Sequence, residues 1–322
     1  MSQRYAIIGT GALGGFYGCR LQRAGCAVHF LLHSDYEHVA RHGLICESKD
    51  GDFTLPKVHA YRNVREMPAC DVVIVALKAT QNHRLPELLP ASGAVLLMQN
   101  GLGGEELIAG IVGPERVVSG LSFLCSNKVG PGHIRHLDYG HVALGEFATW
   151  GASDRLRAIA GDFERAGIPV QLLDDCRVAR WNKLVWNIPY NGLSVILNAM
   201  TVELMAQAET RQLCEQLMWE IVADARACGV PVEDAIVAKM LDHTAKMTPY
   251  RTSMKIDFDE HRPMEVEAIF GNPLRAAEAA GAKSPLVETL YRQLQFLDAA
   301  NRRSATAWSV DARCQDGPAR AQ

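Results

Sequence analysis

The stretch YAIIGTGALGG, residues 5–15, joins a short apolar run to a glycine-rich turn. The run has the composition of a β-strand, and the sequence after the turn has the composition of a helix. Gly9, Gly11 and Gly14 match the GxGxxG pattern of dinucleotide-binding loops. In such loops the first glycine permits a tight turn, the second lets the backbone approach a pyrophosphate, and the third lets the helix pack closely on the sheet. A strand before the motif and a helix after it favour this interpretation over an ordinary glycine-rich turn.

Short apolar runs recur through the first half of the chain. Further strand candidates lie at residues 27–33, 71–78, 94–101 and 116–125. Unbroken runs of Val, Ile and Leu between helical stretches are typical of parallel strands covered on both faces. They predict an α/β fold with a doubly wound, Rossmann-type sheet. Residues 132–146 alternate more, which predicts an antiparallel extension at the sheet edge.

From about residue 176 the sequence becomes helical, with little strand-like pattern. The predicted helices are 176–198, 203–228, 232–246, 259–280 and 285–303. We therefore expect a dinucleotide-binding domain followed by an all-helical C-terminal domain and a flexible tail. The expected bounds are 1–175, 176–308 and 309–322.

Composition narrows the class of partner. The chain has 322 residues and a net charge of only -3, so no basic field predicts binding to nucleic acid or to an anionic membrane. No stretch approaches the roughly 18 uninterrupted apolar residues of a membrane span. Nine cysteines at irregular spacings, and an N-terminus without a secretion signal, are typical of a cytoplasmic protein with reduced thiols. A small-molecule ligand is the default expectation.

The end of the second strand bears on the choice of cofactor. NAD-preferring sites usually place Asp or Glu there to hold the ribose 2′-hydroxyl. Here the tip carries His33 and Ser34, and Asp35 follows one residue later. An imidazole and a hydroxyl suit a 2′-phosphate better than a carboxylate does, which favours NADP. Asp35 turning inward would favour NAD instead.

Two polar residues follow later strands at the same expected edge of the sheet. Lys78 ends the third strand candidate, and Asn100 follows the fourth, directly before a glycine. Ligands bind at the carboxyl edge of α/β sheets, so both are candidates for cofactor or substrate contacts. The alternatives are a solvated lysine and an ordinary Asn-Gly turn.

The segment KLVWNIPYN, residues 183–191, carries Lys183, Asn187 and Asn191 at steps of four. On a helix these three lie within about 80° of one another, and the rest of the circumference is nearly all apolar. A solvent face would be the alternative, but Asn is a poor helix former that is buried only when its hydrogen bonds are met. A lysine on a buried helix can have a lowered pKa and donate a proton. The segment therefore predicts a site, with Pro189 kinking its helix.

A second polar region, residues 251–273, contains Ser253 and Glu265. A carboxylate in this region is a candidate partner for Lys183. From composition alone that partner is open among Asp257, Asp259, Glu260, Glu265 and Glu267.

These motifs stand in a fixed order along nearly the whole chain. They are GTGALG, LKATQ, QNG, K-x3-N-x3-N-x-L-S, and SM followed by E-x-E-x-I-x-G. Twelve residues separate Ser253 from Glu265. This ordered set resembles the ketopantoate reductase (2-dehydropantoate 2-reductase) family.

The resemblance implies an enzyme that reduces the 2-oxo carbon of ketopantoate with NADPH, a step of pantothenate and coenzyme A biosynthesis. Lys183 would be the general acid, and Glu265 would hold the lysine and contact the cofactor. The implied substrate residues are Asn100, Lys183, Asn187, Asn191 and Ser253. The implied cofactor residues are Gly9, Thr10, Gly11, Ala12, Leu13, Gly14, His33, Ser34, Lys78, Asn100, Cys125 (through its backbone) and Glu265. Because helical second domains of such enzymes often supply dimer contacts, a homodimer is left open.

Three departures from the family pattern keep alternatives open, one of which is an insertion-like stretch over residues 33–55 that leaves room for another specificity. The family often has an arginine near the tip of the second strand, where this chain has His33, and Thr201 stands where an asparagine can contact substrate. The rivals are a reductase of a related 2-oxo acid, a 3-hydroxyacid dehydrogenase-like enzyme, and a non-catalytic NADP(H)-binding redox sensor. The intact Lys183 and Glu265 argue against the sensor.

A group of histidines raises the question of a metal. His133, His136 and His141 lie in a strand-like run without the HExxH pattern or supporting acids. We expect exposed strand residues there and no metal site.

Overall fold

The computed structural model describes residues 3–247, 249 and 251–315, with side chains as far as residue 303. It divides into two compact units, Met1–Ala179 and Arg180–Gln322. The tail predicted over residues 309–322 lies beyond the described side chains, and residues 316–322 lie outside the described residues altogether.

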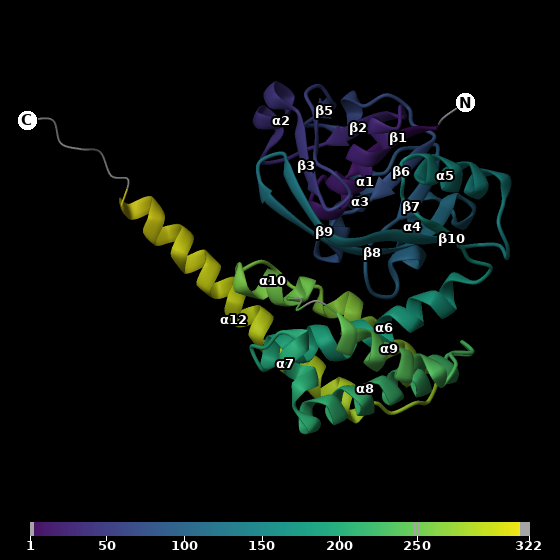
Figure 1. Cartoon of the computed structure of the whole chain (residues 1–322), viewed down its shortest axis with the longest axis vertical. Coiled ribbons are helices and arrows are strands. Elements are labelled where there is room, and N and C mark those ends of the chain that lie inside the picture. Colours follow the sequence, from purple (N-terminus) through teal and green to yellow (C-terminus); the bar gives the residue numbers. More distant parts are fainter. Residues whose placement is uncertain (1–2, 248, 250, 316–322) are drawn as a thin grey trace, which may run out of the picture. The chain divides into compact units, whose positions relative to one another are not determined.

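The first unit is built on one mixed sheet, drawn in purple to teal in Figure 1. Its described strands are β1 (Arg4–Ile8), β2 (Ala27–Leu31), β3 (Leu44–Ser48), β4 (Phe53–Leu55), β5 (His59–Tyr61), β6 (Val72–Val75), β7 (Ala94–Leu97), β8 (Val117–Gly130), β9 (His133–Glu146) and β10 (Val170–Leu172). Their order is β4-β3-β9-β8-β7-β6-β1-β2-β5, with β10 beside β9. Chain order therefore reverses at β1, which has β6 on one side and β2 on the other.

The parallel, Rossmann-type part of the prediction is confirmed over β5-β2-β1-β6-β7-β8, where each neighbouring pair runs parallel. β9 pairs antiparallel with β8, as predicted for residues 132–146. Its predicted place at the sheet edge is wrong, because β3 and β4 extend the sheet beyond it. These two strands come from a stretch between β2 and β5 that carries no long apolar run.

Helices cover both faces of this sheet. They are α1 (Ala12–Arg23), α2 (Tyr36–His42), α3 (Leu85–Leu88), α4 (Gly104–Val112) and α5 (Asp154–Arg165). Side chains alternate between the faces along each strand. In β7, Leu96 packs in the same cluster as Phe16 of α1 and Phe163 of α5. Its neighbour Val95 packs with Ile108 of α4 on the opposite face. Burial on both faces explains why these strands are unbroken apolar runs.

The second unit is helical in its described residues (Figure 1). Its elements are α6 (Cys176–Ile196), which begins in the first unit, α7 (Thr201–Ala206), α8 (Ala208–Ala227), α9 (Ala235–Lys246), α10 (Ser253–Asp259), a π-helical turn (Glu267–Gly271), α11 (Asn272–Ala279) and α12 (Pro285–Gln315). The prediction of a single helix over 259–280 is wrong. The extended segment after α10 interrupts it, and the amide of Met264 donates to the Asp298 carboxylate there instead of to a helical carbonyl.

Helix α6 packs closely against its neighbours. A Cβ on Gly192 would lie 2.5 Å from the Leu290 side chain of α12, so glycine permits this approach. The indole of Trp186 donates to the Thr244 hydroxyl of α9 at 3.0 Å. The helix continues through Pro189, whose missing amide removes one helical hydrogen bond. In the part of the chain that the structure describes, no helix is long and apolar enough to cross a membrane.

Candidate active site

The glycine loop connects β1 to α1, and its three glycines serve different purposes. Gly9 has a φ of 99°, and a Cβ there would lie 2.5 Å from the amide nitrogen of Leu77. At Gly14 a Cβ would lie 2.3 Å from the Gly9 carbonyl oxygen. A Cβ on Gly11 would meet nothing within 4 Å. The first and third glycines are thus required by packing inside the protein, whereas the second faces space that a ligand can enter.

Side chains fix this loop at both ends. The Thr10 hydroxyl donates to the Leu31 carbonyl at the end of β2, at 3.0 Å. The Ser126 hydroxyl of β8 donates to the carbonyl of Ala12, at 3.2 Å. The first turn of α1, with Ala12 and Leu13, contains no acidic residue, so the positive end of the helix dipole is not opposed there. This arrangement suits a phosphate group.

Asp35 does not occupy the position that would select NAD. Its carboxylate accepts from the Lys128 ammonium at 2.7 Å and from the amide of Gly132 at 3.1 Å. Burial by itself would raise the pKa of Asp35, but these two contacts outweigh it and lower the pKa. His33 and Ser34, in contrast, are both exposed just beyond β2. The carboxylate of Asp35 thus belongs to an ion pair with Lys128, whereas His33 and Ser34 face solvent.

Lys78 and Asn100 follow β6 and β7, which are neighbouring parallel strands. Lys78 is exposed and precedes a 3₁₀ turn over Ala79–Arg84. Asn100 is half-buried and precedes Gly101, which has a φ of 93°. Because both strands end at one edge of the sheet, these residues lie on the same side of the unit as the glycine loop.

Gln99 is a residue of this edge for which the sequence predicted no role. It is 5% exposed, and its amide nitrogen donates to the Leu77 carbonyl at 2.8 Å and to the Asn82 side chain at 2.7 Å. It thereby ties the segment after β7 to the segment after β6. The signal was present in the sequence, since a carboxamide at the end of an apolar strand needs hydrogen-bond partners.

Cys125 lies inside a strand, and not at its end as the sequence had predicted. The predicted strand ended at Cys125, but β8 continues to Gly130, and Cys125 pairs there with Asp138 of β9. Register shifts stand on both sides of Cys125 along the strand. Such irregularities next to a site re-aim backbone groups, so the backbone of Cys125 remains a candidate for a cofactor contact.

In the second unit, helix α6 carries Lys183, Asn187 and Asn191 along one line. Asn187 and Asn191 are 5% and 2% exposed, so this line is not a solvent face. The Asn191 side-chain oxygen accepts from the amide of Met254 at 3.4 Å, in the first turn of α10. Ser253, also expected to contact substrate, is the first residue of α10 and is half-buried. Asn191 and Ser253 are therefore brought together where α6 meets the start of α10, and Lys183 and Asn187 lie on the same line of α6.

The pKa of Lys183 is lowered to about 7. Burial is the main cause, the charge of Arg180 adds to it, and the Glu265 carboxylate opposes it. An ammonium with such a pKa can give up a proton near neutral pH. Lys183 thus has the acidity that a general acid requires.

The contacts of the carboxylates in this region favour one of them as the partner of Lys183. Glu265 is 5% exposed and acts electrostatically on Lys183. The rival carboxylates have other basic partners: Arg262 for Asp257 and Glu260, Lys255 and Arg251 for Asp259, and Arg275 for Glu267. Glu265 also lies two residues before the π-helical turn Glu267–Gly271, and such turns are frequent at functional sites. Thr201, where the family has an asparagine, is buried at the start of α7.

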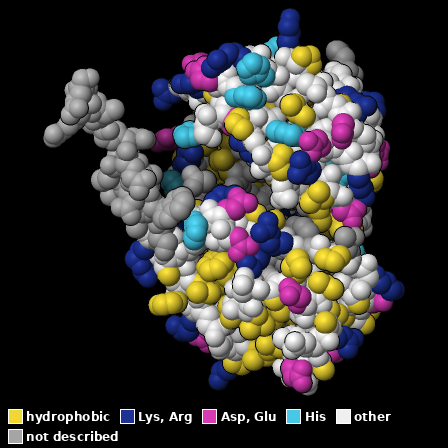
Figure 2. Space-filling model, turned by 60° about the vertical axis from the view of Figure 1, so that its left-hand side comes forward, with side chains coloured by type: hydrophobic (Ala, Val, Ile, Leu, Met, Phe, Trp, Pro, Cys, Tyr) yellow, Lys and Arg dark blue, Asp and Glu magenta, His cyan; other side chains and the backbone are white. Residues whose placement is uncertain are grey.

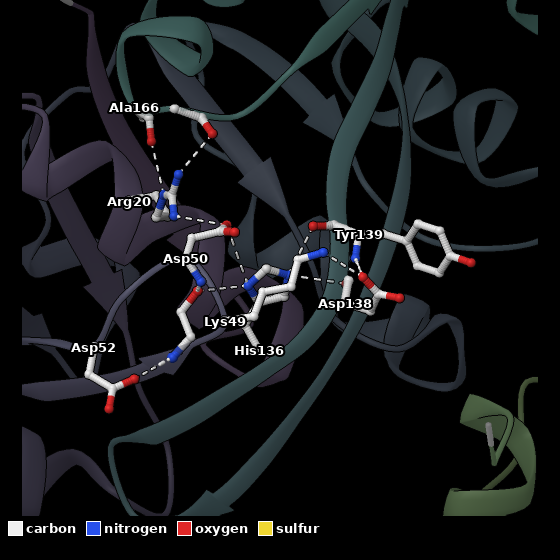
Figure 3. A network of polar contacts seen from close by, with 10 residues as sticks. Arg20, Lys49, Asp50, Asp52, His136, Asp138, Tyr139 and Ala166 are labelled. Atoms are coloured by element: carbon white, nitrogen blue, oxygen red, sulfur yellow. Dashed lines mark hydrogen bonds and ion pairs between the residues drawn. The ribbon is translucent and has the colours of Figure 1, made fainter. Parts of the chain in front are cut away.

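The expectation that the histidines of β9 are exposed is wrong, because His136 is 2% exposed and His133 and His141 are half-buried. Figure 3 shows the polar contacts of His136. Its Nε2 lies 3.1 Å and 3.0 Å from the carbonyl oxygens of Asp138 and Tyr139, and its Nδ1 lies 2.9 Å from the Ser48 hydroxyl. Two carbonyls at Nε2 require a proton on that nitrogen, so Nδ1 accepts from Ser48 when the ring is neutral. The histidine holds β9 to β3, and no group of three or more potential metal-ligating side chains occurs among the described residues.

Comparisons with known proteins cover both units of the chain. Family models described as "Ketopantoate reductase PanE/ApbA" and its C-terminal part match residues 5–149 and 175–298. A 2-dehydropantoate 2-reductase from a Nostoc species is 59% identical over 308 residues, covering 93% of this chain and 97% of that one. The crystal structure of a 2-dehydropantoate 2-reductase from Geobacter metallireducens is 43% identical, with a TM-score of 0.88, covering 91% of this chain and 99% of that one. Another, from Methylococcus capsulatus, is 34% identical with a TM-score of 0.84, covering 92% and 97%.

The matched regions include the glycine loop of the first unit and the lysine helix of the second. Both the ordered motifs and the fold agree with the family over most of the chain. The chain therefore belongs to the ketopantoate reductase family.

Proposed function

We propose that this protein reduces 2-dehydropantoate (ketopantoate) to pantoate with NADPH, the activity for which its 59% identical relative is named. The observation that carries the proposal is the pKa of Lys183, which is lowered to about 7 while the charge of Glu265 acts on it. The helix of this lysine also carries the buried Asn187 and Asn191. A carbonyl reduction needs one proton at the oxygen for each hydride at the carbon, and this lysine suits that need.

The first unit fits a dinucleotide. Space is open at Gly11, the turn is fixed by Gly9 and Gly14, and α1 begins at Ala12 without an acidic residue in its first turn. The carboxylate of Asp35, which could favour NAD at the end of β2, is held by Lys128 instead, which supports NADPH. When bound, NADPH supplies the hydride and leaves as NADP⁺.

The protein's own residues then have distinct roles. Lys183 donates its proton to the 2-oxo oxygen, and its charge stabilises the alkoxide that develops there. Glu265 holds the lysine. Asn187, the amide nitrogen of Asn191 and the Ser253 hydroxyl bind the carboxylate and hydroxyl groups of the substrate. A hydride and a proton together convert the oxo group to a hydroxyl group.

Two further cofactor and substrate contacts complete the proposal. Lys78 contacts the cofactor at the carboxyl edge, and Asn100 lies between nicotinamide and substrate. A homodimer and a cytoplasmic location, with its reducing conditions, are also proposed. The exposed Leu197, Met200 and Trp219 of the second unit support the homodimer, and the mostly buried cysteine thiols of the described residues support the reducing conditions.

The test follows NADPH absorbance after addition of ketopantoate, other 2-oxo acids, or 3-hydroxy acids with NADP⁺. We expect rapid oxidation of NADPH with ketopantoate, and its loss in Lys183→Ala. Lys246→Ala, which removes an exposed lysine of α9, should keep full activity. Preferential turnover of another 2-oxo acid or of a 3-hydroxy acid would replace the proposed substrate. Binding of NADPH without any turnover would favour a redox sensor.

A further inference from the structure

The carboxyl end of β5 places an arginine beside the end of β2. The two strands are parallel, with Leu31 opposite Tyr61, and the amide of Leu32 donates to the Tyr61 carbonyl at 2.9 Å. Arg62 follows directly after β5. It therefore leaves the sheet next to His33, although 29 residues separate the two in the sequence.

Two neighbours hold the guanidinium of Arg62 near the start of α2. It lies over the ring of Tyr36, 4.7 Å from the ring centroid, and forms a close ion pair with Glu37. The Arg62 side chain is 58% exposed, so an anion in solvent can reach it. An arginine stacked on an aromatic ring is pre-oriented and loses little entropy when it binds a planar or tetrahedral anion.

The other acidic group at this end of the sheet is already neutralised. Asp35 pairs with Lys128, so Glu37 is the carboxylate that a ligand near Arg62 would meet. Histidine, basic and acidic side chains lie close together on the upper part of the first unit in the view of Figure 2. The surface around Arg62 thus offers a cation, a hydroxyl on Ser34 and an imidazole on His33 to an anionic group.

We propose that Arg62 binds the 2′-phosphate of NADPH, and that Glu37 is the counter-ion that this phosphate displaces. The inference rests on the proposed use of NADPH. In Rossmann-type folds the ribose 2′-position lies at the end of the second strand, where an arginine nearby accommodates the phosphate. Arg62 reaches this position from the neighbouring strand, and its planar fork of donors matches phosphate oxygens.

The experiment measures binding of NADPH and NADH to the full chain by nicotinamide fluorescence, without substrate. Arg62→Ala should weaken NADPH binding about ten- to hundredfold, the effect of losing a hydrogen-bonded charge pair. NADH binding should be unchanged. Arg62→Lys, which keeps the charge without the fork, should lose less. Arg65→Ala removes another exposed arginine of the same segment and should leave both cofactors bound as before.

Glu37→Gln tests the counter-ion. It should tighten NADPH binding about two- to fivefold, the range of an exposed ion pair, and leave NADH unaffected. Adenosine 2′,5′-bisphosphate and 5′-AMP serve as probes that lack the nicotinamide half, and Arg62→Ala should affect only the first. Weaker NADPH binding by Glu37→Gln would overturn its role as a displaced counter-ion.

The two proposals fail in different ways. If the unaltered protein prefers NADPH and Arg62→Ala keeps that preference, the role of Arg62 is wrong while the reductase proposal stands. If the unaltered protein binds NADH as tightly as NADPH, NADPH specificity itself is wrong, and the role of Arg62 falls with it. Equal losses for both cofactors in Arg62→Ala would indicate a structural role and would also overturn the inference.

Discussion

The glycine loop of the first unit and helix α6 of the second hold their candidate residues by opposite means. The loop works through its backbone. A Cβ added at Gly9 or Gly14 would lie under 3 Å from neighbouring atoms, whereas one added at Gly11 would meet nothing within 4 Å. Helix α6 works through side chains, a half-buried lysine with a lowered pKa and two buried asparagines. The loop should therefore be sensitive to any added atom, whereas the helix should be sensitive to the loss of a functional group.

The largest effect is expected at Lys183. Lys183→Ala should lower kcat about 10²- to 10⁴-fold, the usual contribution of a general acid, and leave NADPH binding nearly unchanged. Steady-state kinetics and a cofactor titration measure the two quantities. Lys246→Ala is the matched control on α9. A parallel loss of NADPH affinity would mean that Lys183 serves the cofactor and not the proton transfer.

The loop side of the comparison is tested by alanine at two glycines. Gly9→Ala should lower the free energy of unfolding by about 2–4 kcal/mol, because a Cβ would approach the Leu77 amide and the φ is positive. Gly11→Ala should leave stability within about 0.5 kcal/mol, since its Cβ meets nothing, but should weaken NADPH binding about tenfold. Urea unfolding and cofactor titration distinguish the two. Equal stability losses would show that Gly11 does not face a ligand.

On the helix side, Glu265 should act on the acidity of Lys183. Its carboxylate raises the pKa of that lysine, so Glu265→Gln should lower the pKa further below about 7. Since only the protonated lysine donates, kcat falls as pH rises through this pKa. The alkaline limb of the pH–rate profile should move to lower pH, and above the pKa each unit costs about tenfold in protonated lysine. A pH–rate profile of unchanged shape would show that Glu265 does not set the acidity of Lys183.

A smaller effect, on the free energy of unfolding, is expected at Asp224, a buried acid that has no part in the proposed chemistry. Burial raises the pKa of Asp224 in α8 to about 6, although a hydrogen bond from Ser284 opposes the rise and Glu220 adds to it. The pKa of the folded state is above the unfolded value of about 3.9, so this group's contribution to stability is complete below about pH 4 and is lost as pH rises through about 6.

Asp224→Asn should therefore raise the free energy of unfolding by about 1–3 kcal/mol at about pH 7, and the gain should vanish below about pH 4. Denaturant unfolding at both pH values measures it. Activity should not change, because a shifted pKa marks a functional site only when the geometry agrees. A drop in kcat would place Asp224 in the machinery after all.

The sequence was most informative where a local structural requirement can be satisfied by only one type of residue or one spacing. The three glycines of the loop were predicted with their separate purposes, since each need is local to the turn. The spacing of Lys183, Asn187 and Asn191 predicted a buried line because a helix puts every fourth residue on one side. Five of the parallel strands, β1, β2, β6, β7 and β8, could be predicted in the same way, as apolar runs, whereas the short β5 carries no such run and was missed.

Other features depend on partners distant in sequence, and local patterns miss them. His136 looked like an exposed strand residue, yet β3 covers it and Ser48 supplies its partner, 88 residues away. β3 itself was missed because it is short, only two of its five residues are buried, and it lacks an apolar run. Similarly, the contribution of Arg62 to the end of β2 follows from strand pairing alone. Composition alone left five acids open as partners of Lys183, and their contacts favour Glu265, the acid that the family resemblance implied.

The joint between α6 and α10 has a consequence for engineering substrate range. The Ser194 hydroxyl lies 2.8 Å from the Thr252 hydroxyl, Asn191 accepts from the Met254 amide, and Thr252 accepts from the amide of Lys255. These hydrogen bonds thus hold together α6 and the start of α10, which carry Lys183, Asn187, Asn191 and Ser253. Libraries that recode residues 251–254 alone should yield mostly misfolded or inactive clones. Blocks exchanged between relatives should include residues 187–194 and 251–255 together.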